Sequence, residues 1–243
     1  MLRVERISKD FNGLRALDEV SFEVGEAEII GLIGPNGSGK STAFNLITGA
    51  LAVSSGSIYF NGEDVTRLPA HQVARRGLAR TFQLVRPFPH ISVLDNVAAG
   101  FLFGPQDGLN RHEAEGLAQE VLQQVGLEAK ATHLAADLTV VERKWLEIGR
   151  ALAGKPKMLL LDEFMAGLSS NEIPRALDLI KSLHAQGISV IIVEHIVKAV
   201  TSVCQRVIVL NAGRKLAEGS VKDIVSNEKV IEAYLGSRHA HSH

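Results

Sequence analysis

Apolar and polar residues alternate along three short stretches near the start of the chain, at residues 2–8, 20–24 and 57–60. Alternation with a period of two is typical of strands that bury one face, and Asn61-Gly62 after the third stretch is a turn signal. These stretches therefore predict an antiparallel sheet. Phe11 falls in a polar stretch between the first two strands, where an aromatic residue is either a packing residue or a ligand contact.

Two later stretches, residues 157–163 and 187–195, are continuous apolar runs that end in polar residues. Such runs are typical of strands buried on both faces of a parallel sheet. The first run ends in Asp162-Glu163 and the second in Glu194-His195. Because open α/β sheets bind ligands beyond the carboxyl ends of their strands, we expect these polar residues to lie at a site.

Helical periodicity replaces the strand patterns from Pro87 to about Ala153, with a loop at residues 104–108. We interpret this region as a mostly helical subdomain inserted into an α/β core. On either side of it, residues 77–83 predict a strand that ends in Gln83, and residues 206–218 predict a terminal hairpin.

The apolar run at residues 29–33 leads directly into a glycine-rich turn and then a helical segment at residues 43–48. The turn matches G-x-x-x-x-G-K-[ST], the phosphate-binding P-loop. Glycines let backbone N–H groups converge on an anion, and a helix that starts near Gly39 directs its positive end there. Lys40 can reach the β- and γ-phosphates, and the Ser41 hydroxyl can ligate Mg²⁺. The residues predicted to bind nucleotide in this turn are Gly34, Asn36, Gly37, Ser38, Gly39, Lys40, Ser41 and Thr42.

The alternative is an ordinary glycine-rich turn between a strand and a helix. The acidic pair Asp162-Glu163 argues against it, because an acid that ends an apolar strand downstream of a P-loop belongs near Mg²⁺. Glu163 could orient and deprotonate an attacking water. Two acids at a strand end are a weak signal alone, since charges commonly mark strand ends, but with the P-loop they become a strong one.

Composition narrows the function further. The chain has 243 residues, 46% hydrophobic and 22% charged, enough for one large domain or two intimate ones. A formal net charge of −1 gives no basic field for nucleic acid, so we expect no nucleic-acid partner. No apolar run reaches membrane-spanning length and the polar start is no signal peptide, so we expect a cytoplasmic protein. The single cysteine, Cys204, excludes an internal disulfide, and we expect it to be a half-buried, inert thiol.

Together, the P-loop and the acidic pair Asp162-Glu163 resemble the motifs of the ATP-binding subunits of ATP-binding cassette (ABC) transporters. The resemblance extends from about Leu2 to Gly236. The resemblance implies that ATP and Mg²⁺ are the cofactors and that Glu163, Gln83 and His195 are catalytic. Asp162, Ser41 and Gln83 would then hold the metal. Phe11 lies 23 residues before Gly34, where the family places an aromatic that stacks on adenine. The family also implies a head-to-tail dimer in which one chain's signature sequence completes its partner's ATP site.

The predicted fold class is α/β, a P-loop NTPase (RecA-like) core with an antiparallel β subdomain and an inserted α-helical subdomain. We predict a single ATP-binding domain over residues 1–236, with residues 1–85 and 154–236 forming the core and residues 86–153 the helical subdomain. Residues 237–243 are polar, and we expect them to be a disordered tail. Their alternate histidines could bind metal weakly, but a solvated tail is favoured.

The sequences of several segments are similar to those of subunits serving branched-chain amino-acid importers: residues 79–83, 88–89, 93–97, 166–168 and 234–236. Urea and lipopolysaccharide exporter subunits share part of these sequences. The resemblance implies three kinds of partner, namely a second ATP-binding subunit, membrane permease subunits and, indirectly, an extracytoplasmic solute-binding protein, but no nucleic acid. The chain would then lie on the inner face of the plasma membrane, held there by the permeases.

Three features of the sequence depart from the family pattern. The signature Leu-Ser-Gly-Gly-Gln appears as Leu138-Thr139-Val140-Val141-Glu142, Phe164 replaces the usual proline, and Ser169 replaces an acid or amide. Thr139 keeps the hydroxyl, so we retain it as a contact to the partner's ATP. We hypothesise that two copies of this chain form a poor ATP sandwich, because β-branched valines resist the dihedrals that glycines allow.

Three alternatives remain open at this point. A non-transport ABC protein acting in DNA repair or on ribosomes would usually carry two cassettes or a long coiled-coil insertion, and neither is visible. A regulatory ATP-binding module would hydrolyse poorly because its signature has drifted. A P-loop small-molecule kinase would not require Gln83, Glu163 and His195 together.

Overall fold

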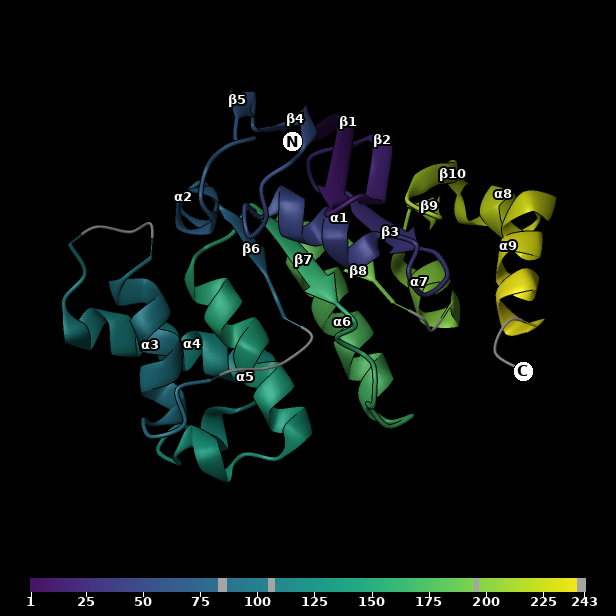
Figure 1. The fold of residues 1–243 in the computed structure, drawn as a ribbon. Helices are drawn as coiled ribbons and strands as arrows, with labels where there is room; N and C mark the ends of the chain where they lie inside the picture. Colours follow the sequence, from purple (N-terminus) through teal and green to yellow (C-terminus); the bar gives the residue numbers. More distant parts are fainter. Residues whose placement is uncertain (83–86, 105–107, 195–196, 240–243) are drawn as a thin grey trace.

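The computed structural model describes residues 1–82, 87–104, 108–194 and 197–239, and the account below concerns these residues. Two sheets, with helices packed on both sides of the larger one, make up the molecule (Figure 1). This arrangement confirms the predicted α/β class.

The predicted antiparallel sheet is present, and its strands are longer than predicted. Its order is β2-β1-β4-β5, formed by β1 (Leu2–Phe11), β2 (Leu14–Val24), β4 (Ser55–Phe60) and β5 (Glu63–Asp64). Asn12 and Gly13 close the β1–β2 hairpin with φ angles of 45° and 93°. Two consecutive positive φ angles match the twist of the flanking strands, which is why Asn-Gly suits this turn. Phe11 is therefore the last residue of β1, and the prediction that it lies in a connecting stretch was wrong.

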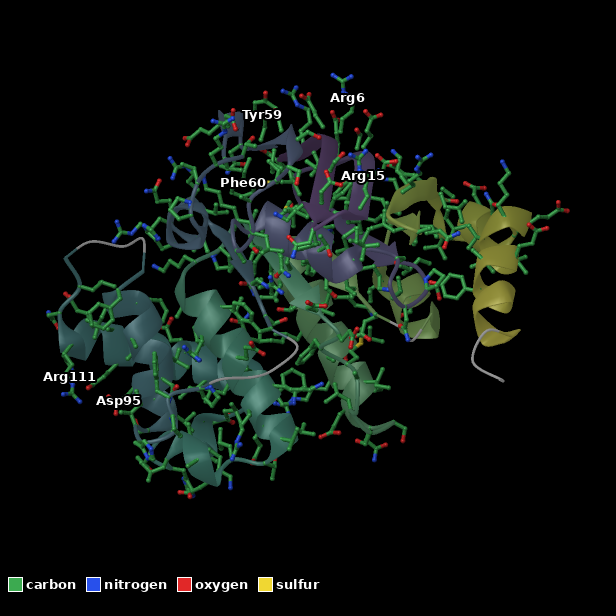
Figure 2. The ribbon with its side chains drawn as sticks, in the orientation of Figure 1. Arg6, Arg15, Tyr59, Phe60, Asp95 and Arg111 are labelled. Atoms are coloured by element: carbon green, nitrogen blue, oxygen red, sulfur yellow. The ribbon has the colours of Figure 1, made fainter. Side chains whose placement is uncertain are left out.

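Side chains alternate across this sheet as the sequence pattern predicts. Phe60 of β4 is 1% exposed and faces the core, while its neighbour Tyr59 lies on the outer side, where the Arg3 guanidinium stacks 4.6 Å from its ring. Figure 2 shows Tyr59 at the outer rim of the sheet, with Phe60 directed inward.

The larger sheet has the order β10-β9-β3-β8-β7-β6. It consists of β3 (Ile29–Ile33), β6 (Leu78–Arg80), β7 (Met158–Asp162), β8 (Ser189–Val193), β9 (Arg206–Asn211) and β10 (Arg214–Ser220). The pairings from β9 to β6 are parallel, and only β10 joins antiparallel, as the predicted terminal hairpin. The strand predicted at residues 77–83 is shorter than expected, because it ends at Arg80.

The core lies on both faces of the parallel sheet. Leu159 and Leu161 of β7 belong to one apolar cluster with helices of the lower layer, whereas Met158 and Leu160 belong to a second cluster beneath the antiparallel sheet. Because successive side chains in a strand point to opposite faces, a strand covered on both sides must be apolar throughout. This explains the unbroken apolar runs in the sequence.

The helices are α1 (Lys40–Ile47), α2 (Ala70–Arg75), α3 (Val93–Leu102), α4 (Arg111–Val125), α5 (Val140–Ala153), α6 (Glu172–Ala185), α7 (Val197–Val203), α8 (Val221–Val225) and α9 (Glu228–His239). Figure 1 shows α3, α4 and α5 gathered on one side of the molecule, and α8 and α9 at the opposite end. Arg111 of α4 and Asp95 of α3 approach to 3.4 Å at the outer edge of this helical layer (Figure 2). The predicted helical region is thus confirmed, with two short 3₁₀ turns at Glu128–Lys130 and Ala135–Asp137.

The end of the chain corrects one expectation. Helix α9 continues to His239, so residues 237–239 are helical and not part of a disordered tail. Once the buried residue Val230 anchors the helix to the core, adding polar residues to its end needs no new nucleus. The rest of the predicted tail, residues 240–243, lies outside the described residues. Within the described ranges, none of the helices has the length and apolarity needed to cross a membrane.

Candidate functional site

The glycine-rich turn sits between β3 and α1, with β2 against it. Gly39 precedes α1 with φ at 104°, and a Cβ there would lie 2.6 Å from Leu17 Cδ2 and 3.0 Å from the Ala16 carbonyl. Only glycine satisfies both the dihedral and the space. No side chain caps the first turn of α1, and that turn contains no acidic residue. The helix therefore keeps its N-terminal N–H groups and its positive end available to an anion.

Lys40 is held inside this turn. Its side chain is buried, and Nζ donates to the carbonyl oxygens of Gly34 and Pro35, each at 2.9 Å. Burial lowers the pKa of the Lys40 ammonium, while the negative charges of Glu163 and Asp162 act in the opposite direction. The structure thus brings the predicted phosphate-binding lysine and the two predicted acids into one electrostatic group.

Asp162 ends β7 with its side chain 4% exposed. Its Oδ2 accepts a hydrogen bond from Arg80 at 3.2 Å, and its backbone N–H donates to Thr81 Oγ1 at 3.1 Å. Burial raises the pKa of this carboxyl, and the charge of Arg80 opposes that rise. Among the residues that the structure describes, the other oxygen, Oδ1, is buried and has no hydrogen-bond partner. A buried acceptor without a partner is unfavourable, so this atom is set up to receive a ligand or a bound water.

The donor set fits a magnesium ion. Asp162 and Ser41 line one cavity of about 740 Å³, with Asn45 and Arg80 in the same wall. Among the described residues there is no group of three or more His, Cys, Asp or Glu side chains that could enclose a metal. Magnesium normally keeps several waters and uses one or two protein ligands with substrate phosphates, so a hydroxyl and one carboxylate suffice.

Glu163 follows Asp162 in a left-handed backbone conformation, with φ at 50°. A non-glycine residue there is strained by about 1–3 kcal/mol and is found most often at functional sites. Its N–H donates to the Val193 carbonyl at 2.9 Å, and Lys144 Nζ donates to the carbonyls of Phe164 at 3.2 Å and of Ala166. These bonds hold the loop that carries the half-buried Glu163 side chain, whose negative charge acts to raise the pKa of Lys40.

Two charged residues of this region escaped the sequence analysis. Besides Asp162, Arg80 binds Asn45 Oδ1 of α1 at 2.6 Å. Glu147 of α5 accepts a hydrogen bond from the Phe82 N–H at 2.7 Å, and burial raises its pKa to about 7. The signal was present for both, because a charged residue in an otherwise apolar strand or helix face is rarely buried without a partner.

Phe11 has its side chain 41% exposed, and Lys9 Nζ lies 5.1 Å from the ring centroid. The ring belongs to neither apolar cluster of buried residues. This exposure leaves a ring face accessible to a base, and stacking on adenine stays a prediction.

Known proteins were compared with this chain. Residues 17–166 match the family model described as ABC transporter, and residues 214–240 match the model described as branched-chain amino acid ATP-binding cassette transporter. The chain is 35% identical to the high-affinity branched-chain amino acid transport ATP-binding protein BraF of Pseudomonas aeruginosa, covering 97% of this chain and 98% of that one. The chain belongs to the ABC transporter ATP-binding family. It is therefore an ATPase of the ABC class, the ATP-binding subunit of a transporter.

Other relatives and solved structures agree with this assignment. The chain is 36% identical to LivG of Salmonella typhimurium over 97% of its length, and 34% identical to the lipopolysaccharide export system ATP-binding protein LptB of Escherichia coli K12 over 97%. LivG and LptB are themselves covered to 98% and 97%. The ADP conformation of MJ1267, an ATP-binding cassette of an ABC transporter, superposes with a TM-score of 0.87 at 34% identity, covering 97% of this chain and 98% of that chain.

In this ABC ATPase the altered signature forms the start of α5. Thr139 Oγ1 accepts from the Glu142 N–H at 3.2 Å, and Glu142 Oε2 accepts from the Thr139 N–H at 2.8 Å. This reciprocal pair is a capping box, which satisfies two otherwise unpaired donors. The bond from the Thr139 backbone is the main reason why the pKa of Glu142 is lowered. Val140 occupies the first helical position and is 72% exposed. In the free chain both valines therefore lie in ordinary helical backbone and do not take the unusual dihedrals that glycines allow.

The substitution at Phe164 has a packing reason. The Phe164 ring meets Trp145 of α5 edge to face, with 5.1 Å between ring centroids, and Arg175 of α6 stacks on the same indole at 4.3 Å. The aromatic residue therefore joins the loop after Asp162 to the helix that follows the altered signature.

Two predicted catalytic residues, Gln83 and His195, lie outside the described residues. Their described neighbours, Phe82 and Glu194, make the following contacts. Phe82 is bound by Glu147, and Glu194 accepts from the Met165 N–H at 2.5 Å in the loop after Glu163.

Proposed function

We propose that this ABC ATPase energises the import of branched-chain or related amino acids through membrane permease subunits. The substrate class is inferred from the match of residues 214–240 to the branched-chain amino acid model. The site itself cannot indicate it, because no residue of this chain is expected to touch the transported solute. The similarity to LptB at nearly the same identity supports one rival, lipopolysaccharide export. Neither the family match nor the relatives favour a regulatory or non-transport role.

The residues of the site suggest how ATP is bound and hydrolysed. Lys40 leaves the Gly34 and Pro35 carbonyls to neutralise the β- and γ-phosphates, and the open N-terminus of α1 donates N–H groups to the same oxygens. Ser41 and Asp162 would hold Mg²⁺, Asp162 through water, and the metal when bound withdraws charge from the phosphates. Glu163 orients the attacking water and accepts its proton. Gln83 and His195 are proposed to complete this arrangement.

The partner chain would complete each site. We infer a head-to-tail dimer in which Thr139, exposed at the start of α5, faces the ATP bound to the other chain. Figure 1 shows α5 in the helical layer, separate from α1. The proposed single domain at residues 1–236, with its helical subdomain at residues 86–153, would move as two parts when the dimer closes.

The permease subunits are proposed to dock in the 740 Å³ cavity that also reaches Asp162. Its outer wall carries three exposed aromatic rings: Phe82 at 53%, Phe88 at 51% and Phe103 at 81%. The Arg150 guanidinium lies 4.7 Å from the Phe88 ring centroid, which gives the groove a charged floor. Docking there would place the chain on the inner face of the plasma membrane, with a solute-binding protein acting on the other side.

Uptake measurements test the proposal. Deletion of the gene should lower uptake of radiolabelled leucine, isoleucine and valine, and the wild-type gene should restore it. A Glu163→Gln variant, expressed to the same level, should not restore it. Normal uptake in the deletion strain, with a defect in lipopolysaccharide assembly, would overturn the import proposal and support the export function.

A further inference from the structure

Three backbone carbonyl groups of the loop after β7 converge on one side chain of α5. The Lys144 ammonium donates to the carbonyl oxygens of Phe164 at 3.2 Å and of Ala166. The Glu163 carbonyl oxygen lies 3.5 Å from the same nitrogen, at the outer limit of a hydrogen bond. An ammonium group has three N–H donors and no acceptor, so three carbonyl oxygens match its full capacity.

The backbone turn at Glu163 makes this convergence possible. In a strand, neighbouring carbonyl groups bond to opposite sides, so those of Glu163 and Phe164 meet one atom only where the chain turns. Glu163 supplies the turn with φ at 50°, and the Ala166 N–H donates back to the Glu163 carbonyl at 3.2 Å. Oxygens directed at one point repel one another, and a cation between them replaces that repulsion by attraction. Lys144 and the left-handed conformation of Glu163 therefore support each other.

Negative side chains also surround the half-buried ammonium. Burial lowers the pKa of Lys144, while the charges of Glu194, Glu147 and Glu163 act to raise it. Glu194 holds the same loop, because its Oε1 accepts a hydrogen bond from the Met165 N–H at 2.5 Å. A cation on its carbonyl groups and an anion on one of its N–H groups thus fix the loop.

Helix α5 contacts this loop a second time, through the next residue. Trp145 meets the Phe164 ring with 5.1 Å between the ring centroids. Lys144 is the fifth residue of α5, and Thr139 of the altered signature is the N-cap of that helix. One helix therefore carries both the segment proposed to face the partner's ATP and the lysine that holds the Glu163 loop of its own chain.

We propose that Lys144 is a positioning residue for Glu163, because its ammonium fixes the carbonyl groups of residues 163–166 and with them the direction of the Glu163 carboxylate. The proposal rests on the role of Glu163 as the base in the proposed function. It gives α5 a task in the ATP site of its own chain, besides the contact that its signature is proposed to make with the partner's ATP.

Lys144→Met removes the ammonium and keeps the length of the side chain. We expect the single-turnover rate of Mg-ATP hydrolysis, measured with protein in excess, to fall about tenfold to a hundredfold, because even a small misplacement of a reacting group is that costly. The dissociation constant of Mg-ATP should stay within about twofold, since the P-loop is unchanged. Lys144→Arg restores a cation with several donors, so its rate should lie between those of Lys144→Met and the wild type.

The matched control is Lys181→Met. It removes a lysine of α6 whose side chain is 59% exposed and lies 3.7 Å from Asp178. This variant should hydrolyse Mg-ATP at the wild-type rate.

A positioning role also predicts that the effects of two substitutions are not additive. Glu163→Gln leaves no base to position, so adding Lys144→Met should not lower the residual rate further. A general loss of folded protein would lower the rate in either background.

Amide exchange tests the loop without catalysis. In the nucleotide-free protein, the Ala166 amide should exchange at least about threefold faster in Lys144→Met than in the wild type, because the loop that holds its acceptor, the Glu163 carbonyl, loses its cation. In Lys181→Met it should exchange as in the wild type.

The outcomes separate this proposal from the role of Glu163. A wild-type rate in Lys144→Met, or unchanged exchange at the Ala166 amide, would overturn the positioning role. A further loss in the double variant would overturn it as well, because Lys144 would then act otherwise than through Glu163. Undiminished hydrolysis by Glu163→Gln would instead overturn the assignment of the base, on which the proposal rests.

Discussion

The Arg80 guanidinium donates to Asp162 Oδ2 across 3.2 Å, between two neighbouring strands, with the two side chains 9% and 4% exposed. The same guanidinium reaches Asn45 on α1 and stacks 4.6 Å from the Phe82 ring centroid. Arg80 therefore joins the helix after the P-loop, the acid that is proposed to bind the metal and the aromatic groove. Arg80 also engages one particular oxygen of Asp162, because within the described part of the chain Oδ2 has a partner and Oδ1 has none.

Replacing Arg80 by Ala should lower the free energy of unfolding by about 3–5 kcal/mol, because it leaves Asp162 buried without its charge partner. Urea unfolding measures this. The matched control is Arg76→Ala, which removes a more exposed guanidinium paired with Glu63 at 2.8 Å and should change stability by less than about 1 kcal/mol. Equal effects of the two substitutions would contradict the buried pair.

Lys40→Ala should weaken ATP binding by about tenfold or more, because the ammonium supplies charge at the β- and γ-phosphates. Glu163→Gln should instead keep ATP binding and abolish turnover, since it removes the base and leaves the phosphate-binding loop intact. Nucleotide titration and phosphate release on both variants separate the two roles. Undiminished hydrolysis by Glu163→Gln would rule out Glu163 as the base.

Phe11→Ala should reduce ATP affinity by about 1–3 kcal/mol if the exposed ring stacks on adenine. Phe11→Tyr should preserve the affinity, because the ring face remains. Leu14, the cross-strand neighbour of Phe11, is 71% exposed, so Leu14→Ala is a control for general loss of apolar surface. The stacking role fails if Phe11→Ala binds ATP as the wild type does.

The purified chain alone should bind Mg-ATP and turn over well below the ~10 s⁻¹ typical of enzymes. In its signature, Val140 is exposed where a partner's ATP would approach, and the Glu142 carboxylate already binds the Thr139 N–H. A phosphate of the partner's ATP that approaches this helix end would meet the like charge of Glu142. It would also meet the Cβ atom of Val140, where the family has a glycine. Val140→Gly and Val141→Gly combined with Glu142→Gln should raise turnover of the homodimer.

Glu142→Gln alone is the matched control for that variant, because glutamine preserves the capping box and removes only the charge. A gain in the single variant would assign the effect to charge, and a gain only in the triple variant to backbone access. Fast hydrolysis by the unmodified chain would show that the altered signature is harmless.

Stability should depend on pH through Glu147, whose pKa burial raises to about 7. Its folded pKa lies above its unfolded value of 4.5, so the folded state binds the proton more tightly. The free energy of unfolding therefore falls as pH rises from 4.5 toward 7 and is level above that. Glu147→Gln should remove this dependence and gain about 1–3 kcal/mol on the wild type between pH 5 and pH 8.

Urea unfolding at the two pH values measures the gain. Glu120→Gln, at an exposed position of α4, is the control and should show the same pH dependence as the wild type. A constant difference between Glu147→Gln and the wild type across this range would mean that the carboxyl titrates normally.

Much of the site could be predicted because its signals are local. The spacing from Gly34 to Thr42 encodes a turn whose backbone dihedrals only glycine and a following helix can supply, and residues 157–163 encode a buried strand that ends in two acids. Period-two alternation likewise predicted the antiparallel sheet, and unbroken apolar runs predicted the parallel one, since each pattern depends only on which faces of a strand meet the core. Those features need no knowledge of distant residues.

The sequence by itself thus determined the nucleotide-binding loop, the acidic pair and the α/β layers. The tertiary structure alone decided that Arg80 pairs with Asp162 and that Glu147 binds Phe82. Each of these contacts depends on the register of strands or the position of a helix, because the two partners lie 82 and 65 residues apart in the sequence. Such pairing follows from how the whole chain buries its apolar surface, and no short pattern encodes it.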